Sequence, residues 1–202
     1  MRGKILLVLH THLPYVHHPE YGSFLEERWL FEAITETYIP LLMAFEEMKN
    51  FRLTMSFSPP LLEMLCTKDL QEKYRRHMEK LIELSKKEMV VTKNEDPRKH
   101  KMAKYYLEHF QKVLEVFESL GGNIVEGFKR YQRDGKLEII TCNATHAFLP
   151  LYQMYPRIVD AQLNVAVQNY KKHFGKEPRG IWLAECGYFE GLEAFLSKHG
   201  LE

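Results

Sequence analysis

Two histidines near the start of the sequence have the spacing of ligands on one face of a strand. His10 and His12 follow the apolar run Lys4–Leu9 and are two residues apart, so their side chains share one face of an extended chain. Such a pair can hydrogen-bond one substrate or bind one metal ion. A structural histidine held by a hydrogen bond is the alternative for one of them.

Polar residues also follow three further apolar runs of the sequence. Ser56 and Ser58 follow the second run, His146 follows the third, and Glu185 follows the fourth. Functional groups of parallel α/β proteins collect at the carboxyl ends of strands, so we expect these side chains to meet at one edge of a sheet. After apolar Trp182 and Leu183, the Glu185 carboxylate is expected to be partly buried and to need partners. It could serve as a nucleophile or an acid/base, and a structural salt bridge is the alternative.

The elements that must position these residues alternate between strands and helices. Four short apolar runs predict strands, at Lys4–Leu9, Phe51–Phe57, Leu137–Thr141 and Gly180–Leu183. Apolar residues at helical spacing predict helices over 31–48, 70–84, 102–117, 158–170 and 192–196. Pro40 predicts a kink or a second helix start within the first of them. This alternation predicts a parallel sheet, either doubly wound or part of a (β/α) barrel.

The block from Asp69 to Arg133 is too long for one crossover connection, so it predicts a helical subdomain inserted between the second and third strands. Within it, the polar run Lys93–Lys101 predicts a solvated loop. Gly200 and Leu201 after the last helix have the pattern of a helix C-cap. The next strand of an α/β fold is expected there, so a barrel would be incomplete in this sequence.

Composition excludes several classes of function. Lys and Arg number 28 and Asp and Glu 27, so the net charge of +1 gives no reason to expect nucleic acid or an anionic membrane as partner. No stretch approaches 18 apolar residues, which predicts no transmembrane helix. Three cysteines without CxxC spacing favour a reduced, cytoplasmic protein and give no zinc ligand set. No GxGxxG motif follows any predicted strand.

Four segments together resemble glycoside hydrolase family 57. HTHLPY at 10–15, GKLEIIT at 135–141 with NATHAFLPL at 143–151, and WLAECGY at 182–188 resemble its first three signature regions. EERWLFEAITETYIPLL at 26–42 resembles the helix after the first strand in branching-enzyme and amylase-like members. The resemblance implies an α/β fold, the incomplete (β/α)7 TIM-like barrel. Residues 1–202 would be its N-terminal portion, with four strands and a helical insertion at about 69–133.

The same resemblance implies a retaining enzyme that acts on α-1,4-glucans through a glycosyl-enzyme intermediate, without metal or organic cofactor. Branching or glucanotransferase activity is the first expectation, and α-amylase-type hydrolysis is the alternative. Glu185 would be the nucleophile. Substrate-binding roles are implied for His10, His12, Trp29, Glu138, His146 and Trp182. The commoner branching-enzyme form has proline at the position of Ala184 and alanine at that of Gly187.

The acid/base aspartate of the family belongs to a fourth motif, and nothing in this sequence matches that motif. The sequence is therefore expected to be the N-terminal portion of a longer enzyme, inactive by itself. Two further readings stay open. His10, His12 and His146 could hold Zn²⁺ in an amidohydrolase-like enzyme with Glu185 as ligand or base. The chain could also be a glucan-binding fragment without catalysis. Oligomeric state is not predicted by any of these patterns.

Overall fold

The computed structural model describes residues 3–202, which form two compact units. The first unit comprises the residues up to Tyr15 together with Asn50–Met64 and Phe128–Glu202. The second comprises Val16–Lys49 and Leu65–Gly127. All candidate residues at strand ends belong to the first unit, so that unit positions the site.

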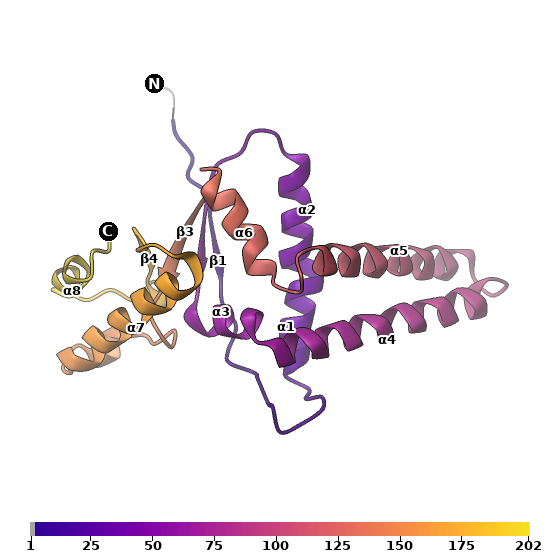
Figure 1. Cartoon of the computed structure of the whole chain (residues 1–202), viewed down its shortest axis with the longest axis horizontal. Coiled ribbons are helices and arrows are strands. Elements are labelled where there is room, and N and C mark those ends of the chain that lie inside the picture. The colour runs from indigo at the N-terminus through magenta and orange to yellow at the C-terminus, as the bar shows by residue number, and fades with distance from the viewer. Residues whose placement is uncertain (1–2) are drawn as a thin grey trace. The chain divides into compact units, whose positions relative to one another are not determined.

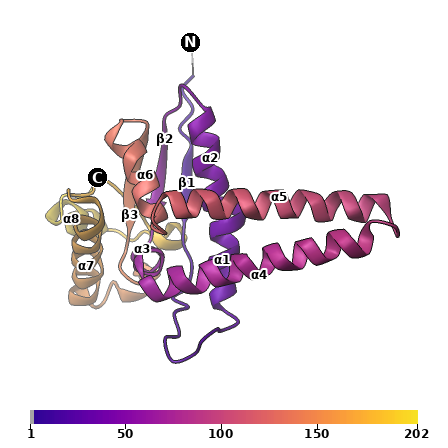
Figure 2. The same cartoon turned by 45° about the vertical axis from the view of Figure 1, so that its right-hand side comes forward.

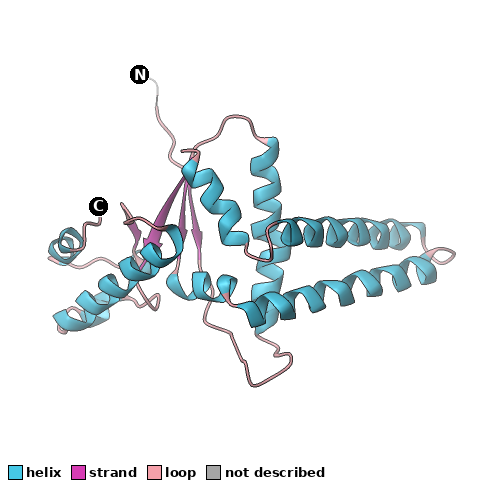
Figure 3. Ribbon diagram, in the orientation of Figure 1, coloured by secondary structure: helices cyan, strands magenta, loops and turns pink. Residues whose placement is uncertain are grey.

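The first unit is built on a parallel sheet of four strands in the order β1-β2-β3-β4. The strands are β1 (Val8–Thr11), β2 (Leu53–Phe57), β3 (Leu137–Cys142) and β4 (Ile181–Trp182). Figure 3 shows them side by side. In their register Val8 lies opposite Thr54, Leu53 opposite Leu137, and Thr141 opposite Ile181. This arrangement confirms the predicted α/β fold with its four parallel strands.

The first strand begins later than predicted. Residues 3–7 have no regular structure, and Ile5, Leu6 and Leu7 are 98%, 76% and 55% exposed, so the prediction of a buried strand at Lys4–Leu9 was wrong. A strand exists only where a partner supplies hydrogen bonds. Among the described residues β2 is the only neighbour of β1, and it begins at Leu53. His10 therefore lies inside the strand and not after it.

Helices of the first unit cover the sheet and close its core. They include α7 (Pro156–Phe174), α8 (Leu192–Lys198) and the short 3-10 helix η2 (Leu149–Tyr152), with α3 (Pro59–Cys66) and α6 (Ile124–Arg133) reaching into this unit. Figure 2 shows α7 beside β3. A buried cluster joins η2, α7, α8 and the residues after α8: Leu149, Val159, Leu163, Val167, Leu192 and Leu201. Leu201 N–H donates to Leu196 O at 3.0 Å and Gly200 has φ +67°, which confirms the predicted C-cap.

The second unit is helical. It contains α1 (Glu27–Ala33), the π-helical turn η1 (Ile34–Tyr38), α2 (Ile39–Glu47), α4 (Lys68–Thr92) and α5 (Pro97–Ser119). Helices α4 and α5 run antiparallel as a hairpin (Figures 1 and 2). Pro40 lacks the N–H that would continue an α-helix, and the π turn directly before it confirms the predicted interruption. Tyr74, at the core of this unit, packs against Phe31 and Phe117.

The polar run Lys93–Lys101 is a loop only in its first part. Asp96 caps helix α5 by accepting a hydrogen bond from Arg98 N–H at 2.8 Å, and Pro97 occupies its first turn. The prediction of a loop through Lys101 was therefore wrong, because a capping Asp followed by Pro begins a helix even among charged residues. Within residues 3–202, none of the helices has the length and apolar character needed to cross a bilayer.

A buried ion pair orders the segment that precedes α1. Glu27 is fully buried and its carboxylate accepts from Lys73 Nζ at 2.7 Å and from the backbone N–H groups of His18 and Phe24. Lys73 Nζ also donates to His18 O at 2.9 Å and lies 3.1 Å from Asp69. Each buried charge thus has several partners, which is the condition under which such a pair is tolerated.

Candidate active site

Three imidazoles and an indole meet at the carboxyl ends of β1, β3 and β4. His10 Nε2 lies 3.1 Å from His146 Nε2. The His12 and His146 rings stack with centroids 3.6 Å apart and an interplanar angle of 7°. The Trp182 indole stacks on His10 at 5.4 Å. The structure therefore brings together four of the residues that the sequence singles out, from segments 136 residues apart in the case of His10 and His146.

Two serines, Ser56 in β2 and Ser58 directly after it, contact His10 in β1 and His12 directly after β1. His10 lies opposite Ser56 in the parallel register, and Ser56 Oγ is 2.6 Å from His10 Nδ1. Two residues further on, Ser58 Oγ is 2.9 Å from His12 Nδ1. Both serines are fully buried. Alternate residues of a strand face the same side, so the pairs H-x-H and S-x-S meet along one face of the sheet.

Glu185 lies just beyond β4, in the 3-10 turn η3 (Ala184–Cys186), and its Oε1 is 3.9 Å from His146 Nδ1. Its side chain is 74% exposed whereas that of His146 is 9% exposed, so the expected partial burial of Glu185 was wrong. The reason is local: β4 ends at Trp182, and the chain turns before the carboxylate is reached. The carboxylate consequently projects from the sheet edge beside a buried imidazole.

The backbone at the site adopts conformations that L-residues avoid. Among residues 3–202, only His146, Glu185 and Cys186 are non-glycine residues with positive φ, at +55°, +54° and +54°. Such left-handed residues are costly and cluster at active sites, where surrounding contacts hold them. Two of the three are candidate site residues. Sequence reasoning did not foresee this, because no residue type in either turn signals a left-handed conformation.

Asn143 joins the two turns that carry His146 and Glu185. Its side chain is fully buried, with Nδ2 donating to Ala147 O at 2.7 Å and Oδ1 accepting from Ala184 N–H at 3.3 Å. The amide thus bridges the loop after β3 and the turn after β4. The sequence signal for such a residue is an amide side chain directly after an apolar strand, because it must find hydrogen-bond partners where the strand is buried.

Gly187 lets these two turns approach closely. A Cβ on Gly187 would lie 2.7 Å from the Phe148 ring and 2.9 Å from Pro150 Cδ. Its φ of −77° is accessible to any residue, so the requirement for glycine here is one of space. Alanine, which stands at this position in the commoner branching-enzyme form, does not fit this arrangement of Phe148 and Pro150 without a shift.

Burial keeps the imidazoles of the site neutral near pH 7. It lowers the pKa of His12 to about 4, helped by the positive charge that His146 and His10 would carry. Burial, then the neighbouring His146, also lowers the pKa of His10. Burial lowers the pKa of His146, which the Glu185 carboxylate partly opposes. Neutral imidazoles of this kind hydrogen-bond hydroxyl groups without adding charge to the site.

Two further residues have implied substrate-binding roles, Glu138 in the sheet and Trp29 in the helical unit. Glu138 is near the amino end of β3, opposite Thr54, and its carboxylate lies 3.7 Å from Arg179. Because the histidines occupy the carboxyl ends of the strands, Glu138 lies at the opposite end of the sheet from them, and its substrate-binding role stays a prediction. Trp29 belongs to α1 of the helical unit, where it lines a cavity of about 690 Å³ with Glu32, His77 and others.

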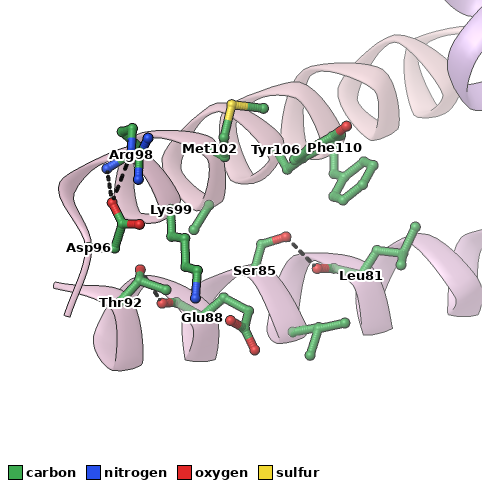
Figure 4. Close-up of a pocket in the computed structure, with 12 residues that line it drawn as sticks. Leu81, Ser85, Glu88, Thr92, Asp96, Arg98, Lys99, Met102, Tyr106 and Phe110 are labelled. Atoms are coloured by element: carbon green, nitrogen blue, oxygen red, sulfur yellow. Dashed lines mark hydrogen bonds and ion pairs between the residues drawn. The ribbon is translucent and has the colours of Figure 1, made fainter.

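A second cavity of the helical unit lies between α4 and α5. It measures about 730 Å³ and is lined mainly by the apolar side chains Leu81, Leu84, Met102, Tyr106 and Phe110 (Figure 4). Asp96, Arg98 and Lys99 border it at the hairpin turn. None of the predicted site residues lines it. In the part of the chain that the structure describes, no group of three or more His, Cys, Asp or Glu side chains is arranged to hold a metal ion.

Comparisons with known proteins agree on one family. The family described as Glycosyl hydrolase family 57 matches residues 6–202. A 1,4-alpha-glucan branching enzyme of Thermococcus kodakarensis is 35% identical over 100% of this chain and 32% of its own length. The alpha-amylase AmyC from Thermotoga maritima, whose crystal structure is solved, is 71% identical in sequence and has a TM-score of 0.98. The match covers 100% of this chain and 39% of that chain.

A branching enzyme of this type from Pyrococcus horikoshii has a solved structure that is 35% identical with a TM-score of 0.90, covering 100% of this chain and 41% of that chain. These similarities confirm the predicted N-terminal part of an incomplete TIM-like barrel with an inserted helical segment. The chain spans 32% of the length of the curated Thermococcus relative and 39% and 41% of the two structures.

Proposed function

Because the chain belongs to glycosyl hydrolase family 57, we propose that this protein acts on α-1,4-glucans with retention of configuration, through a glycosyl-enzyme intermediate on Glu185. The observation that carries the proposal is the placement of Glu185. Its carboxylate is held in a left-handed turn, 3.9 Å from His146 and next to a cluster of neutral imidazoles. A cluster of neutral polar rings beside a carboxylate suits a neutral, hydroxyl-rich substrate.

The proposed reaction begins with attack of a Glu185 oxygen on the anomeric carbon. The bond to the leaving oxygen breaks, a carboxylic acid protonates that oxygen, and the sugar becomes an ester of Glu185. The same acid, now a carboxylate, removes a proton from the acceptor hydroxyl, which displaces Glu185. His10, His12 and His146 would bind hydroxyls near the reacting carbon, and Trp182 would stack against the sugar face.

The acceptor decides between two outcomes. A sugar 6-hydroxyl gives a branch, and we propose this outcome first because relatives 35% identical are branching enzymes. Water gives hydrolysis, and a specific observation supports this second candidate: the structure 71% identical to this chain is an alpha-amylase. The space requirement at Gly187 also separates this chain from the commoner branching-enzyme form.

The test of the proposal replaces the carboxylate. Glu185→Gln, made in the complete enzyme, keeps size and hydrogen-bonding shape, so glucan binding should persist while turnover on amylose falls by at least about a thousandfold. Glu190→Gln, an exposed acid in the same loop, is the matched control and should leave turnover unchanged. A slowly released fluoroglycoside should label the peptide containing Trp182 and Tyr188. Labelling of another carboxylate, or near-normal turnover of Glu185→Gln, would contradict the proposal.

The partner we propose is an α-glucan polysaccharide or oligosaccharide. Trp29, which lines a cavity with acidic and imidazole side chains in the helical unit, supports a further sugar contact there. We propose a cytoplasmic location, which the three free cysteines Cys66, Cys142 and Cys186 support.

A further inference from the structure

The hydrogen bonds behind His10 and His12 determine which ring nitrogen of each carries the proton. The Ser56 side chain is fully buried, and within residues 3–202 its hydroxyl has one partner, His10 Nδ1 at 2.6 Å. A buried hydroxyl has one proton to donate and needs an acceptor for it. Nδ1 can accept that proton only if it carries none itself. In a neutral imidazole the ring proton then resides on Nε2.

A second serine–histidine pair, Ser58 with His12, lies two residues further along the chain. Ser58 is also fully buried, and its hydroxyl lies 2.9 Å from His12 Nδ1. Backbone pairing continues to this point, because Ser58 N–H donates to Thr11 O at 3.1 Å. The sheet therefore fixes both serine–histidine pairs in one geometry.

We propose that Ser56 and Ser58 are positioning residues that hold His10 and His12 in the Nε2–H tautomer. Both histidines then carry a donor on Nε2, the ring nitrogen that does not contact the serine. His12 Nε2 makes no hydrogen bond to another described residue, so its proton is available to a ligand oxygen.

The tautomer of His10 determines which atom donates in each contact from Ser56 to Glu185. His10 Nε2–H donates to His146 Nε2 at 3.1 Å, which leaves the His146 proton on Nδ1. That nitrogen faces Glu185 Oε1 at 3.9 Å. With the opposite direction, an unprotonated Nδ1 would face a carboxylate, and the buried Ser56 proton would have no acceptor. The order Ser56, His10, His146, Glu185 thus places an imidazole N–H beside the carboxylate.

The proposed use of this arrangement rests on the proposed function. A glucan offers hydroxyl oxygens to the His12 Nε2–H, and an ionised Glu185 is the form that attacks an anomeric carbon. The tautomers themselves do not depend on any substrate. Measuring them without a ligand therefore tests the positioning role separately from the glucan activity.

The experiment compares hydroxyl-bearing and hydroxyl-free side chains of equal shape. Thr and Val have the same shape, and Thr carries a hydroxyl where Val carries a methyl group. Ser56→Thr and Ser56→Val therefore share any packing cost and differ only in the hydrogen bond. Ser58→Thr and Ser58→Val form the second pair. Long-range ¹H–¹⁵N correlation spectra at pH 7.5 distinguish the protonated from the unprotonated nitrogen of each imidazole. Wild type and both Thr variants should show His10 and His12 protonated at Nε2. The Val variants should shift the tautomer ratio roughly three- to tenfold towards Nδ1–H at the facing histidine, as the loss of one neutral hydrogen bond predicts.

The wild-type spectrum overturns the proposal if His10 or His12 is protonated at Nδ1, and this result needs no variant to fold. Unchanged tautomers in the Val variants would overturn it as well. Titration with maltohexaose is the separate arm. A change at His12 Nε2 supports its use by a glucan. The expected Nε2–H tautomers without any response to maltohexaose would leave the positioning role intact and count against the proposed function.

Discussion

Acidification of the imidazole cluster should destabilise the fold as the pH falls from 6.5 towards 4. The pKa of His12 falls from 6.5 to about 4 on folding, because burial and the two neighbouring imidazoles disfavour its charged form. The unfolded chain therefore binds more protons than the folded chain between these two pH values. Stability contributed by His12 is fully present above pH 6.5, is lost as the pH falls towards 4, and changes no further below that.

The size of this loss follows from the pKa difference. At ~1.4 kcal/mol for each pH unit, a fall from 6.5 to about 4 sets a ceiling of ~3.4 kcal/mol. The His12 ring is only partly buried, so solvent screening reduces this ceiling, and we expect about 1 kcal/mol between pH 7.5 and pH 5. His10 and His146, whose pKa values are also lowered, add to the total loss in the same direction.

Urea unfolding at pH 7.5 and pH 5 measures the effect, with His12→Asn as the matched variant. The Asn side-chain oxygen can accept the Ser58 hydrogen bond in place of His12 Nδ1, and Asn does not titrate in this range. The variant should lose about 1 kcal/mol less stability than wild type between the two pH values, whatever its stability at pH 7.5. An equal loss in both proteins, or a His12 pKa near 6.5 in an NMR titration, would refute the reasoning.

Three further substitutions test contacts within each of the two units. Lys73→Met leaves the Glu27 charge buried without its cation and should cost about 3–5 kcal/mol in urea unfolding, part of which Glu27→Gln in the same chain should restore. Gly187→Ala should cost about 1–3 kcal/mol by overpacking, seen as a lower Tm, whereas Gly22→Ala, with open space around it, should be neutral. Asn143→Leu leaves the buried Ala184 N–H and the part-buried Ala147 C=O unpaired and should cost about 1–3 kcal/mol, mainly for the N–H; an unchanged Tm would show that the two turns do not need the bridge.

The sequence predicts the meeting of the imidazoles because one simple rule governs it. Parallel strands place their carboxyl ends at one edge, so polar residues that follow different strands must come together there. His10, His146 and Trp182 lie far apart in the chain and obey this rule. A clear apolar stripe of helical period likewise locates a helix, as the stripe around Tyr74 does for α4.

Features set by partners elsewhere in the chain are beyond such rules. The start of β1 depends on where β2 begins, and the apolar run Lys4–Leu9 contains no information about β2. The exposure of Glu185 depends on a turn whose left-handed backbone is held by Asn143 and by close packing at Gly187. Each of these contacts joins segments that are distant in sequence, so neither propensity nor periodicity can indicate them.

The pairing of H-x-H with S-x-S links the chemistry of the site to the register of the sheet. A slip of one residue between β1 and β2 would place His10 opposite Met55 or Phe57, both fully buried and apolar, in place of Ser56. Every side chain of the slipped strand would also change face. The core therefore selects the same register that supplies each histidine with its serine. It follows that substitutions which loosen the packing of Met55 or Phe57 should disturb the tautomers of His10 and His12 together, although neither apolar residue hydrogen-bonds an imidazole.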